Sequence, residues 1–412
     1  MKKPNTTTAR WHYLRSRDQR SRIFRIRSKS KSNSSINSTN IKNDAERKNT
    51  TPSHKIKVKD KVVIWQGGDF EDAISRRLPY TPPKDLCLEN NNEETTRYLE
   101  ALRILGNRTI RFKDKFVKRG KRGLPRIKGY TDFSKLERIS TAAAVVLTAE
   151  YDRIAKFNNE IPPAVNLADW SDAVFLKLFQ VGFFEVLGHA PPQKNVLLKD
   201  GDIQTMQIIR AKDNDELERV DRSLTELGKF LQIQDEVVIE LNTVISEAIS
   251  NMIHHAYPRD NSLSYPHLKS LWVSATANRK NNTLTVVAYD QGASIPITYP
   301  RIDRIAKVAR YLERALRLEP KFEYQNDGTY IRAAMRYGGS RTDQSHRGKG
   351  LPQMLDVLKR IGSGRMKVYS RGGWCEKTPN GKFTSGSTAC SIGGTLIEWS
   401  LELTADKTVV IV

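Results

Sequence analysis

The sequence has no run of about 18 apolar residues, so it predicts no membrane-spanning helix. The N-terminus is basic but lacks the apolar segment of a secretory signal, and we therefore expect no secretion. Cysteine is scarce, since Cys87, Cys375 and Cys390 show neither paired spacing nor neighbouring histidines of metal-ligand type. These absences predict a cytoplasmic protein of a reducing compartment, with no disulfide and no zinc site.

Acidic residues are rare at the start of the chain, where residues 1–60 carry 17 Lys and Arg against 4 Asp and Glu. The whole chain has a net charge of +23, so this segment holds more than half of the excess. It is rich in Ser, Asn and Arg and cannot bury enough apolar surface to offset the entropy of ordering. We expect residues 1–58 to be a disordered basic tail. Its function stays open between an arm for non-specific nucleic-acid binding, helped by Trp11, Tyr13 and Phe24, and a solubilising segment.

Residues 59–190 alternate between predicted strands and helices. The strands are expected at 61–65, 130–139 and 164–167, and the helices at 92–105, ending at Gly106, at 141–157, capped by Ser140 or Thr141, and at 169–179, capped by Asp169. Strand and helix alternate here at βαβ spacing. The pattern predicts an α/β layer with parallel strand pairing.

The sequence DFSKLERISTAAAVVL at 132–147, together with LFQVGFFEVL ending at Leu187, resembles the STAS domain of anti-sigma-factor antagonists. The resemblance implies a regulatory domain over residues 59–190 that meets a protein partner. The family typically has Asp-Ser-Ser-Gly where this chain has Ser140-Thr141-Ala142-Ala143. Ser140 is therefore open to two interpretations, a phosphoacceptor or a helix cap.

A predicted helix begins at Asp235, where DEVVIELNTVISEAISNMIHHAY places apolar residues at the period of a buried helix. Glu240, Glu247, Asn251 and His254 fall at spacings of 7, 4 and 3 and form one polar stripe on it. Burying such groups without a ligand is costly. A carboxylate one turn before a carboxamide can supply a base and an oxygen ligand for Mg²⁺. The alternative is an ordinary solvated helix face.

Two β-rich segments follow, at 271–277 and 284–289, and the turn sequence NRKNNT between them predicts a hairpin. The second strand ends in Asp290-Gln291-Gly292. A carboxylate at a strand end can accept a hydrogen bond from an adenine amino group, and Gly292 allows the base to approach the backbone. Taken alone, the same residues also fit a solvated turn.

The glycine-rich sequence RGKG at 347–350 precedes an amphipathic helix that starts near Leu351. Such a turn presents free backbone N–H groups and the positive end of the helix dipole to an anion such as phosphate. It is not a Walker A loop, because no Ser or Thr follows Gly348-Lys349. Strands are predicted at 366–370 and 395–401, the second opened by Gly393-Gly394-Thr395.

In this order the segments resemble the N, G1, G2 and G3 boxes of the GHKL (Bergerat-fold, histidine kinase-like) ATPases, and 246–258 is most similar to serine-kinase anti-sigma factors. For residues 204–412 the resemblance implies a two-layer α/β sandwich whose mixed sheet is covered on one face by helices, with a lid at 295–350. The implied site roles are Glu247 orienting the attacking water or hydroxyl, Asn251 binding Mg²⁺, Asp290 binding adenine, Gly292 lining the base pocket, Gly348, Lys349 and Gly350 closing over the phosphates of ATP, and Thr395 supporting the adenine contact. Ser294 stands where the family usually has a second glycine.

Two classes of function fit this resemblance. Sensor kinases need a phosphoacceptor histidine on a dimerisation helix, and the only histidine between Lys55 and the predicted helix at Asp235 is His189, in a loop beside two prolines. Topoisomerase and MutL types need a transducer domain after the ATPase. We therefore expect either an ATPase or Ser/Thr kinase of a regulatory or defence system, or a non-catalytic ATP-gated module that binds a protein or nucleic acid.

Overall fold

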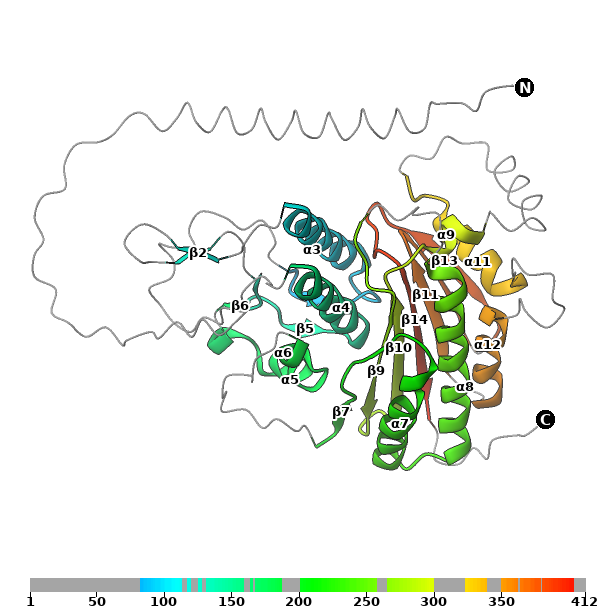
Figure 1. Cartoon of the computed structure of the whole chain (residues 1–412). Coiled ribbons are helices and arrows are strands. Elements are labelled where there is room, and N and C mark those ends of the chain that lie inside the picture. The colour runs from blue at the N-terminus through cyan, green and yellow to red at the C-terminus, as the bar shows by residue number, and fades with distance from the viewer. Residues whose placement is uncertain are drawn as a thin grey trace, which may run out of the picture. The chain divides into compact units, whose positions relative to one another are not determined.

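An antiparallel sheet of eight strands organises the described part of the protein (Figure 1). The computed structural model describes residues 82–112, 117–119, 125–127, 131–158, 164–165, 167–186, 201–257, 265–299, 323–338, 350–361, 364–378 and 380–403. The basic tail, the strand expected at 61–65, and Gly348 and Lys349 lie outside these residues.

The strands of this sheet come almost entirely from the second half of the chain. They are β7 (Ile203–Thr205), β8 (Ile209–Ala211), β9 (Leu271–Asn278), β10 (Thr283–Asp290), β11 (Arg365–Ser370), β12 (Gly373–Lys377), β13 (Phe383–Ser387) and β14 (Thr395–Glu402). Their order is β13-β12-β11-β14-β10-β9-β7, and β8 also pairs with β9. Every pairing in the sheet is antiparallel, so the expectation of a mixed sheet is wrong for the described strands. Hairpin connections account for the pairings of β9 with β10 and of β11 with β12, since a short turn reverses the chain.

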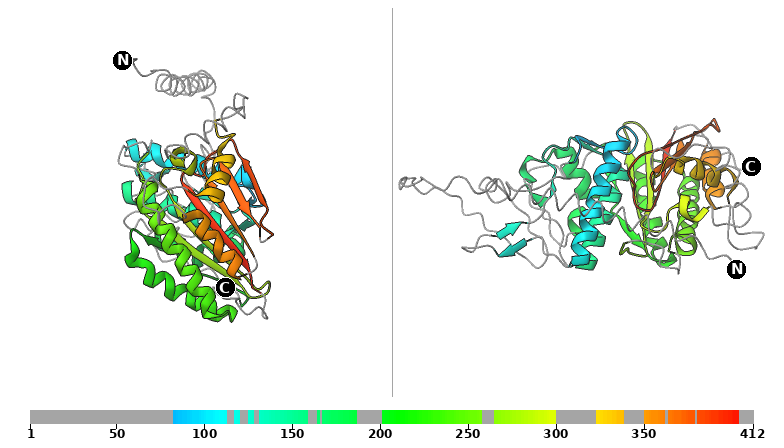
Figure 2. Two further views of the ribbon diagram at one scale, coloured as in Figure 1. Left: turned by 90° about the vertical axis from the view of Figure 1, so that its right-hand side faces the viewer. Right: turned by 90° about the horizontal axis from the view of Figure 1, so that it is seen from above.

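Four helices cover one face of the sheet (Figures 1 and 2). They are α7 (Leu217–Leu231), α8 (Asp235–Asn251), α11 (Asp327–Tyr337) and α12 (Gly350–Ile361). Alternate strand residues such as Val273, Val286 and Trp399 point into this layer and share a core with Leu241 and Ile245 of α8. The periodicity that predicted a buried helix from Asp235 is confirmed, and a π-helical turn, Met252–Ala256, follows α8.

The other face is covered in part by helices from the first half of the chain. They are α3 (Asn92–Phe112), α4 (Thr141–Asn158), α5 (Asp172–Gln180) and α6 (Phe183–Val186). Val145 and Tyr151 of α4 share a core with Trp272, Val287 and Leu396 of the sheet. The helices of residues 204–412 thus cover one face of the sheet, and helices from the first half of the chain lie on the other (Figure 2).

Short pairs of parallel strands lie in the segments between the helices of this second layer. β1 (Asp85–Leu86) pairs with β5 (Arg138–Ile139), and β4 (Thr131–Asp132) pairs with β6 (Ala164–Val165), so the expected parallel pairing is present. A separate antiparallel pair joins β2 (Val117–Arg119) to β3 (Pro125–Ile127). The single strand expected at 130–139 is two short strands, β4 and β5, separated by a turn.

Two helix boundaries differ from the sequence prediction for local reasons. The first helix continues through Gly106 to Phe112. A β carbon at Gly106 would lie 2.7 Å from Ile154 Cδ1, so the glycine permits close packing of α3 on α4 rather than ending the helix. The cap of α5 is Ser171, whose Oγ accepts from the N–H of Val174 at 3.3 Å, and not Asp169.

Ser140 is a helix cap, which was one of its two interpretations. Its Oγ accepts a hydrogen bond from the N–H of Ala143, in the first turn of α4, at 3.2 Å. Among the described residues, no helix is long and apolar enough to cross a lipid bilayer.

Candidate functional site

The polar stripe of α8 meets the first residue of α12. A β carbon built on Gly350 would lie 2.6 Å from Asn251 Nδ2 and 2.8 Å from Glu247 Oε1. Both side chains are partly buried between the two helices. Three predicted site residues from segments about 100 positions apart in the sequence are therefore in direct proximity, and only glycine fits at position 350 without displacing the other two.

Burial also perturbs the acid–base chemistry of the stripe. Partial burial raises the pKa of Glu247, and the nearby His254 opposes that rise. His254 itself is exposed, with its Nδ1 2.7 Å from the carbonyl oxygen of Ser250. A carboxyl with a raised pKa is a better general base when ionised than an ordinary surface carboxylate. Glu247 therefore combines a suitable position with a suitable shift.

Asp290 ends β10 in a buried position beside β14. It pairs with Thr395 across the strands, is 8% exposed, and its Oδ1 accepts a hydrogen bond from the N–H of Gly292 at 2.8 Å. Burial raises the pKa of Asp290 to about 7, against the lowering effect of the backbone N–H groups of Gly292 and Thr395. No described cation neutralises this carboxyl, since none contributes to its pKa. A buried carboxyl without a counter-charge is a costly feature that a hydrogen-bond donor on a ligand can compensate.

Thr395 contacts a group of neighbouring hydroxyl side chains. Its Oγ1 lies 2.9 Å from the Oγ of Ser370, which accepts from the N–H of Ile295 at 2.9 Å. Ser294, the residue that replaces the usual glycine, is 5% exposed and lies in the same group, with its Oγ 3.4 Å from the carbonyl oxygen of Gly394. The start of α9 (Ile295–Thr298) is thus bound to the strand ends that carry Asp290 and Thr395.

Gly292 joins the two groups of predicted residues. A β carbon there would lie 2.2 Å from the carbonyl oxygen of Ala256, at the end of the π-helical turn that follows α8. The N–H of Ala293 donates to the same oxygen at 2.5 Å. The loop after Asp290 and the helix that carries Asn251 are therefore held backbone to backbone, and the glycine is needed for that approach.

Sequence reasoning missed two residues that hold this loop. The hydroxyl of Tyr257 accepts from the N–H of Gln291 at 3.2 Å and donates to the carbonyl of Leu268 at 2.8 Å. Arg103, from α3, donates to the carbonyl of Ser391 at 3.0 Å and lies against Gly393, whose φ is +79°. A tyrosine directly after the polar stripe was the only local signal for the first. The second had none, because 288 residues separate Arg103 from Ser391.

Gly394, like Gly292, makes a close contact with a backbone carbonyl oxygen. Its φ is +146°, and a β carbon there would lie 1.9 Å from the carbonyl oxygen of Asp290. The Gly393-Gly394 turn at the start of β14 therefore packs directly against the backbone of Asp290.

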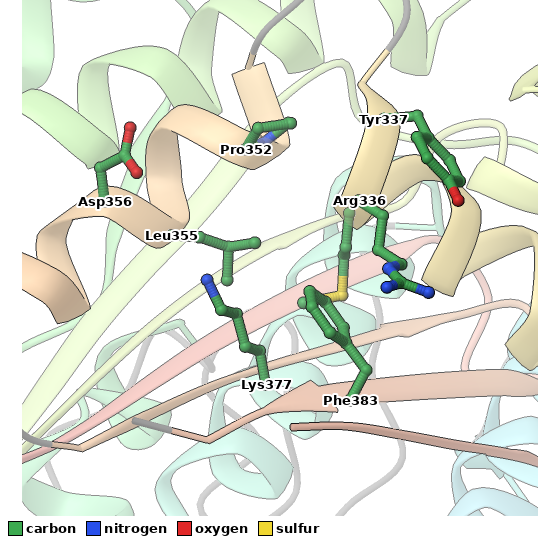
Figure 3. Close-up of a pocket in the computed structure, with 8 residues that line it drawn as sticks. Arg336, Tyr337, Pro352, Leu355, Asp356, Lys377 and Phe383 are labelled. Atoms are coloured by element: carbon green, nitrogen blue, oxygen red, sulfur yellow. The ribbon is translucent and has the colours of Figure 1, made fainter. Parts of the chain in front are cut away.

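The region predicted as a lid is described only in part. α9 and α11 belong to it, and α11 lies against β12 and β13. A cavity of about 400 Å³ lies between α11, α12 and these two strands (Figure 3). Its lining includes Leu355 and Lys377, and Arg336 lies 5.5 Å from the ring centroid of Phe383. None of the predicted site residues that the structure describes lines this cavity.

The side chains present fit a magnesium nucleotide in their chemistry. Glu247 and Asn251 offer hard oxygen atoms for Mg²⁺, and the buried Asp290 carboxyl can accept a hydrogen bond from an amino group. The described residues contain no group of three or more His, Cys, Asp and Glu side chains able to hold a metal ion. A Mg²⁺ ion would therefore be shared between Asn251, phosphate oxygens and water, which is the usual mode for this ion.

No protein-family model matches the chain, and no curated protein sequence matches it significantly.

Proposed function

We propose that the chain binds Mg·ATP in the manner of the GHKL ATPases and uses it for hydrolysis or for phosphotransfer to a Ser or Thr residue. The observation that carries the proposal is the contact of Gly350 with Glu247 and Asn251. The three residues come from two segments that were selected independently in the sequence for metal, base and phosphate roles. A glycine turn with a purely structural role would not be expected to contact the polar stripe of α8.

The adenine end of the proposed site rests on Asp290. Its buried carboxyl accepts a hydrogen bond from its own loop, and no described cation compensates it. In the proposal the exocyclic amino group of adenine donates to this carboxyl, and Thr395 supports the contact. The phosphates lie toward the start of α12, where backbone N–H groups lack acceptors within the helix.

In this proposal the protein contributes positioning and electrostatics rather than covalent chemistry. Glu247 orients the attacking water or hydroxyl and accepts its proton. Asn251 holds the Mg²⁺, whose role when bound is to neutralise charge on the phosphate oxygens. Gly350 allows both side chains to face the same point.

Calorimetry with Mg·ATP on the full chain tests the binding, with Asn251→Ala as the variant and Asn242→Ala as the control. Asn242 lies on the same helix, bonded to Asp221 rather than close to Gly350. We expect Asn251→Ala to weaken binding by about 1.5 to 3 kcal/mol, as for a charge-assisted contact, and the control to bind as the parent does. Equal affinity of the parent and Asn251→Ala would remove Asn251 from the site.

Incubation with γ-labelled ATP then separates the possible activities. Label on protein supports a kinase, and free labelled phosphate supports an ATPase. Binding without either product would favour the second candidate, an ATP-gated binding module. Its support is the hydrogen bond of Ile295, at the start of the predicted lid, to Ser370 beneath Thr395, which connects that segment to the adenine end.

A further inference from the structure

The second face of the central sheet is divided into an apolar half and a polar half. The apolar half, which includes Trp272, Val287 and Leu396, lies in the core with α4. Farther along the same strands and on the same face, the side chains become hydroxyl-bearing or charged. The strand register places Thr205, Thr276, Thr285, Ser400 and Arg365 in one row across five strands.

Lys177 of α5 lies over one end of this row. Its ammonium group donates to Thr205 Oγ1 and Thr276 Oγ1, each at 3.0 Å. Thr141, the first residue of α4, donates its hydroxyl to the same Thr276 oxygen at 2.8 Å. Within the described part of the chain, the hydrogen bonds of Lys177 go to hydroxyl groups.

The charge of Lys177 is not compensated by any described carboxylate. Burial lowers the pKa of Lys177 to about 8, and no charged neighbour contributes to the shift. The group is still mainly protonated at neutral pH. A partly buried cation without a counter-ion is unfavourable in the free protein and becomes favourable when an anion is bound.

A cavity of about 390 Å³ opens beside Lys177 along the polar row. At the lysine end it is lined by Ser140 and Thr141, where α4 begins and where first-turn N–H groups add positive potential. At the other end it is lined by the carboxylates of Glu89, Glu398 and Glu402 and by Arg365, which pairs with Glu89. The Ser400 hydroxyl donates to the Glu398 carboxylate at 3.2 Å. The two ends differ in charge, and the volume lies in the range of small-molecule sites.

We propose that this cavity binds a small metabolite with a phosphate or carboxylate group at Lys177 and the start of α4, and with hydroxyl or amino groups along Thr285 and Ser400 toward Glu398. The site is separate from the proposed ATP site, because it lies on the opposite face of the sheet and shares no residue with it. It does not depend on ATP binding. The alternative is that the polar row is simply a sheet face in contact with water. That alternative does not explain why Lys177 lies over the row without a carboxylate partner among the described residues.

The test uses the full chain with inorganic phosphate and with acetate as probes, at constant ionic strength set by chloride. Competitive acylation followed by mass spectrometry reports the reactivity of each lysine. We expect Lys177 to react faster than ordinary lysines near pH 8, since more of it is unprotonated, and to be protected by phosphate or acetate. Saturating Mg·ATP should leave that protection in place. Stronger protection by one probe identifies the anion class.

The second measurement is the affinity of Lys177→Met for the protecting anion, determined by calorimetry, with Lys84→Met as the matched control. Lys84 is exposed and paired with Glu137 at 2.9 Å. Lys177→Met should bind the protecting anion roughly 10- to 100-fold more weakly than the parent, as for a lost charge-assisted contact, and Lys84→Met should bind it normally. Absence of protection of Lys177 in the parent by both anions would overturn the proposal, as would unchanged anion affinity in Lys177→Met. The labelling result stands on the parent protein even where the Met variant fails to fold.

Discussion

The backbone of Gly350 lies directly against the side chain of Asn251, with 2.6 Å between Asn251 Nδ2 and the position that a β carbon would take. Because the nearest atoms belong to the ends of side chains, a methyl group there would move Asn251 and Glu247 rather than the backbone. The relationship allows the polar site to be disturbed without unfolding the protein.

Gly350→Ala should reduce Mg·ATP affinity while leaving the free energy of unfolding within about 1 kcal/mol of the parent, since alanine also favours the helix. Calorimetry and denaturant unfolding measure the two quantities. Gly201→Ala is the control, because a β carbon at Gly201 meets nothing within 4 Å. Parent-like nucleotide affinity in Gly350→Ala would show that the contact has no part in binding.

Asp290→Asn should make stability less dependent on pH. Burial raises the pKa of Asp290 to about 7 from a usual value of 3.8, so its contribution to stability is fully present below pH 3.8 and is lost as the pH rises through 7. The Asn variant lacks this loss. We expect its Tm advantage over the parent to be larger at pH 8 than at pH 5, and its ATP affinity to be lower by about 1 to 3 kcal/mol.

Asp169→Asn is the matched control for that measurement, since Asp169 is exposed. Its Tm should follow the parent at both pH values. If Asp290→Asn also follows the parent at both pH values, burial does not destabilise the ionised carboxyl, and Asp290 has no need of a hydrogen-bond donor from a ligand.

The elements with a local pattern were predictable from the sequence. The apolar period fixed the helix from Asp235, and the β-rich segments around NRKNNT form the predicted hairpin of β9 and β10. The strands β12 and β13 were missed, and in β13 Gly386 and the hydroxyl residues leave no clear alternation. Contacts of high sequence separation, such as Arg103 with Ser391, leave no trace in local periodicity. For the same reason the sequence could not reveal that α3 and α4 cover the second face of the sheet.

Arg103→Met should destabilise the fold and weaken ATP binding together. Arg103 is 5% exposed and its Nε donates to Glu150 at 3.2 Å, while its Nη2 holds the Ser391 carbonyl. Removing one partner of a buried ion pair typically costs about 3 to 5 kcal/mol. Arg153 also pairs with Glu150 at 2.8 Å and should reduce that cost.

Arg97→Met serves as the control for this change, because Arg97 lies on the same helix in an exposed pair with Glu93. Exposed helical pairs contribute only about 0.3 to 0.5 kcal/mol. Denaturant unfolding and calorimetry should thus separate the two variants. A destabilised Arg103→Met with parent-like ATP affinity would mean that the Gly393-Gly394 turn does not support the nucleotide site.

Glu247→Gln tests the chemistry apart from the binding. The substitution keeps the shape and the contact with Gly350 but removes the base, so turnover should fall by roughly 10² to 10⁴ while Mg·ATP still binds. Glu236→Gln, an exposed substitution on the same helix, should leave turnover unchanged. Because burial raises the pKa of Glu247, the pH–rate profile of the parent should show an acidic limb above the ordinary range of a Glu carboxyl, and the Gln variant should lack it. Undiminished turnover in Glu247→Gln would exclude Glu247 as the base, whereas a parent that binds ATP without turnover would make the ATP-gated module the better explanation of the same site.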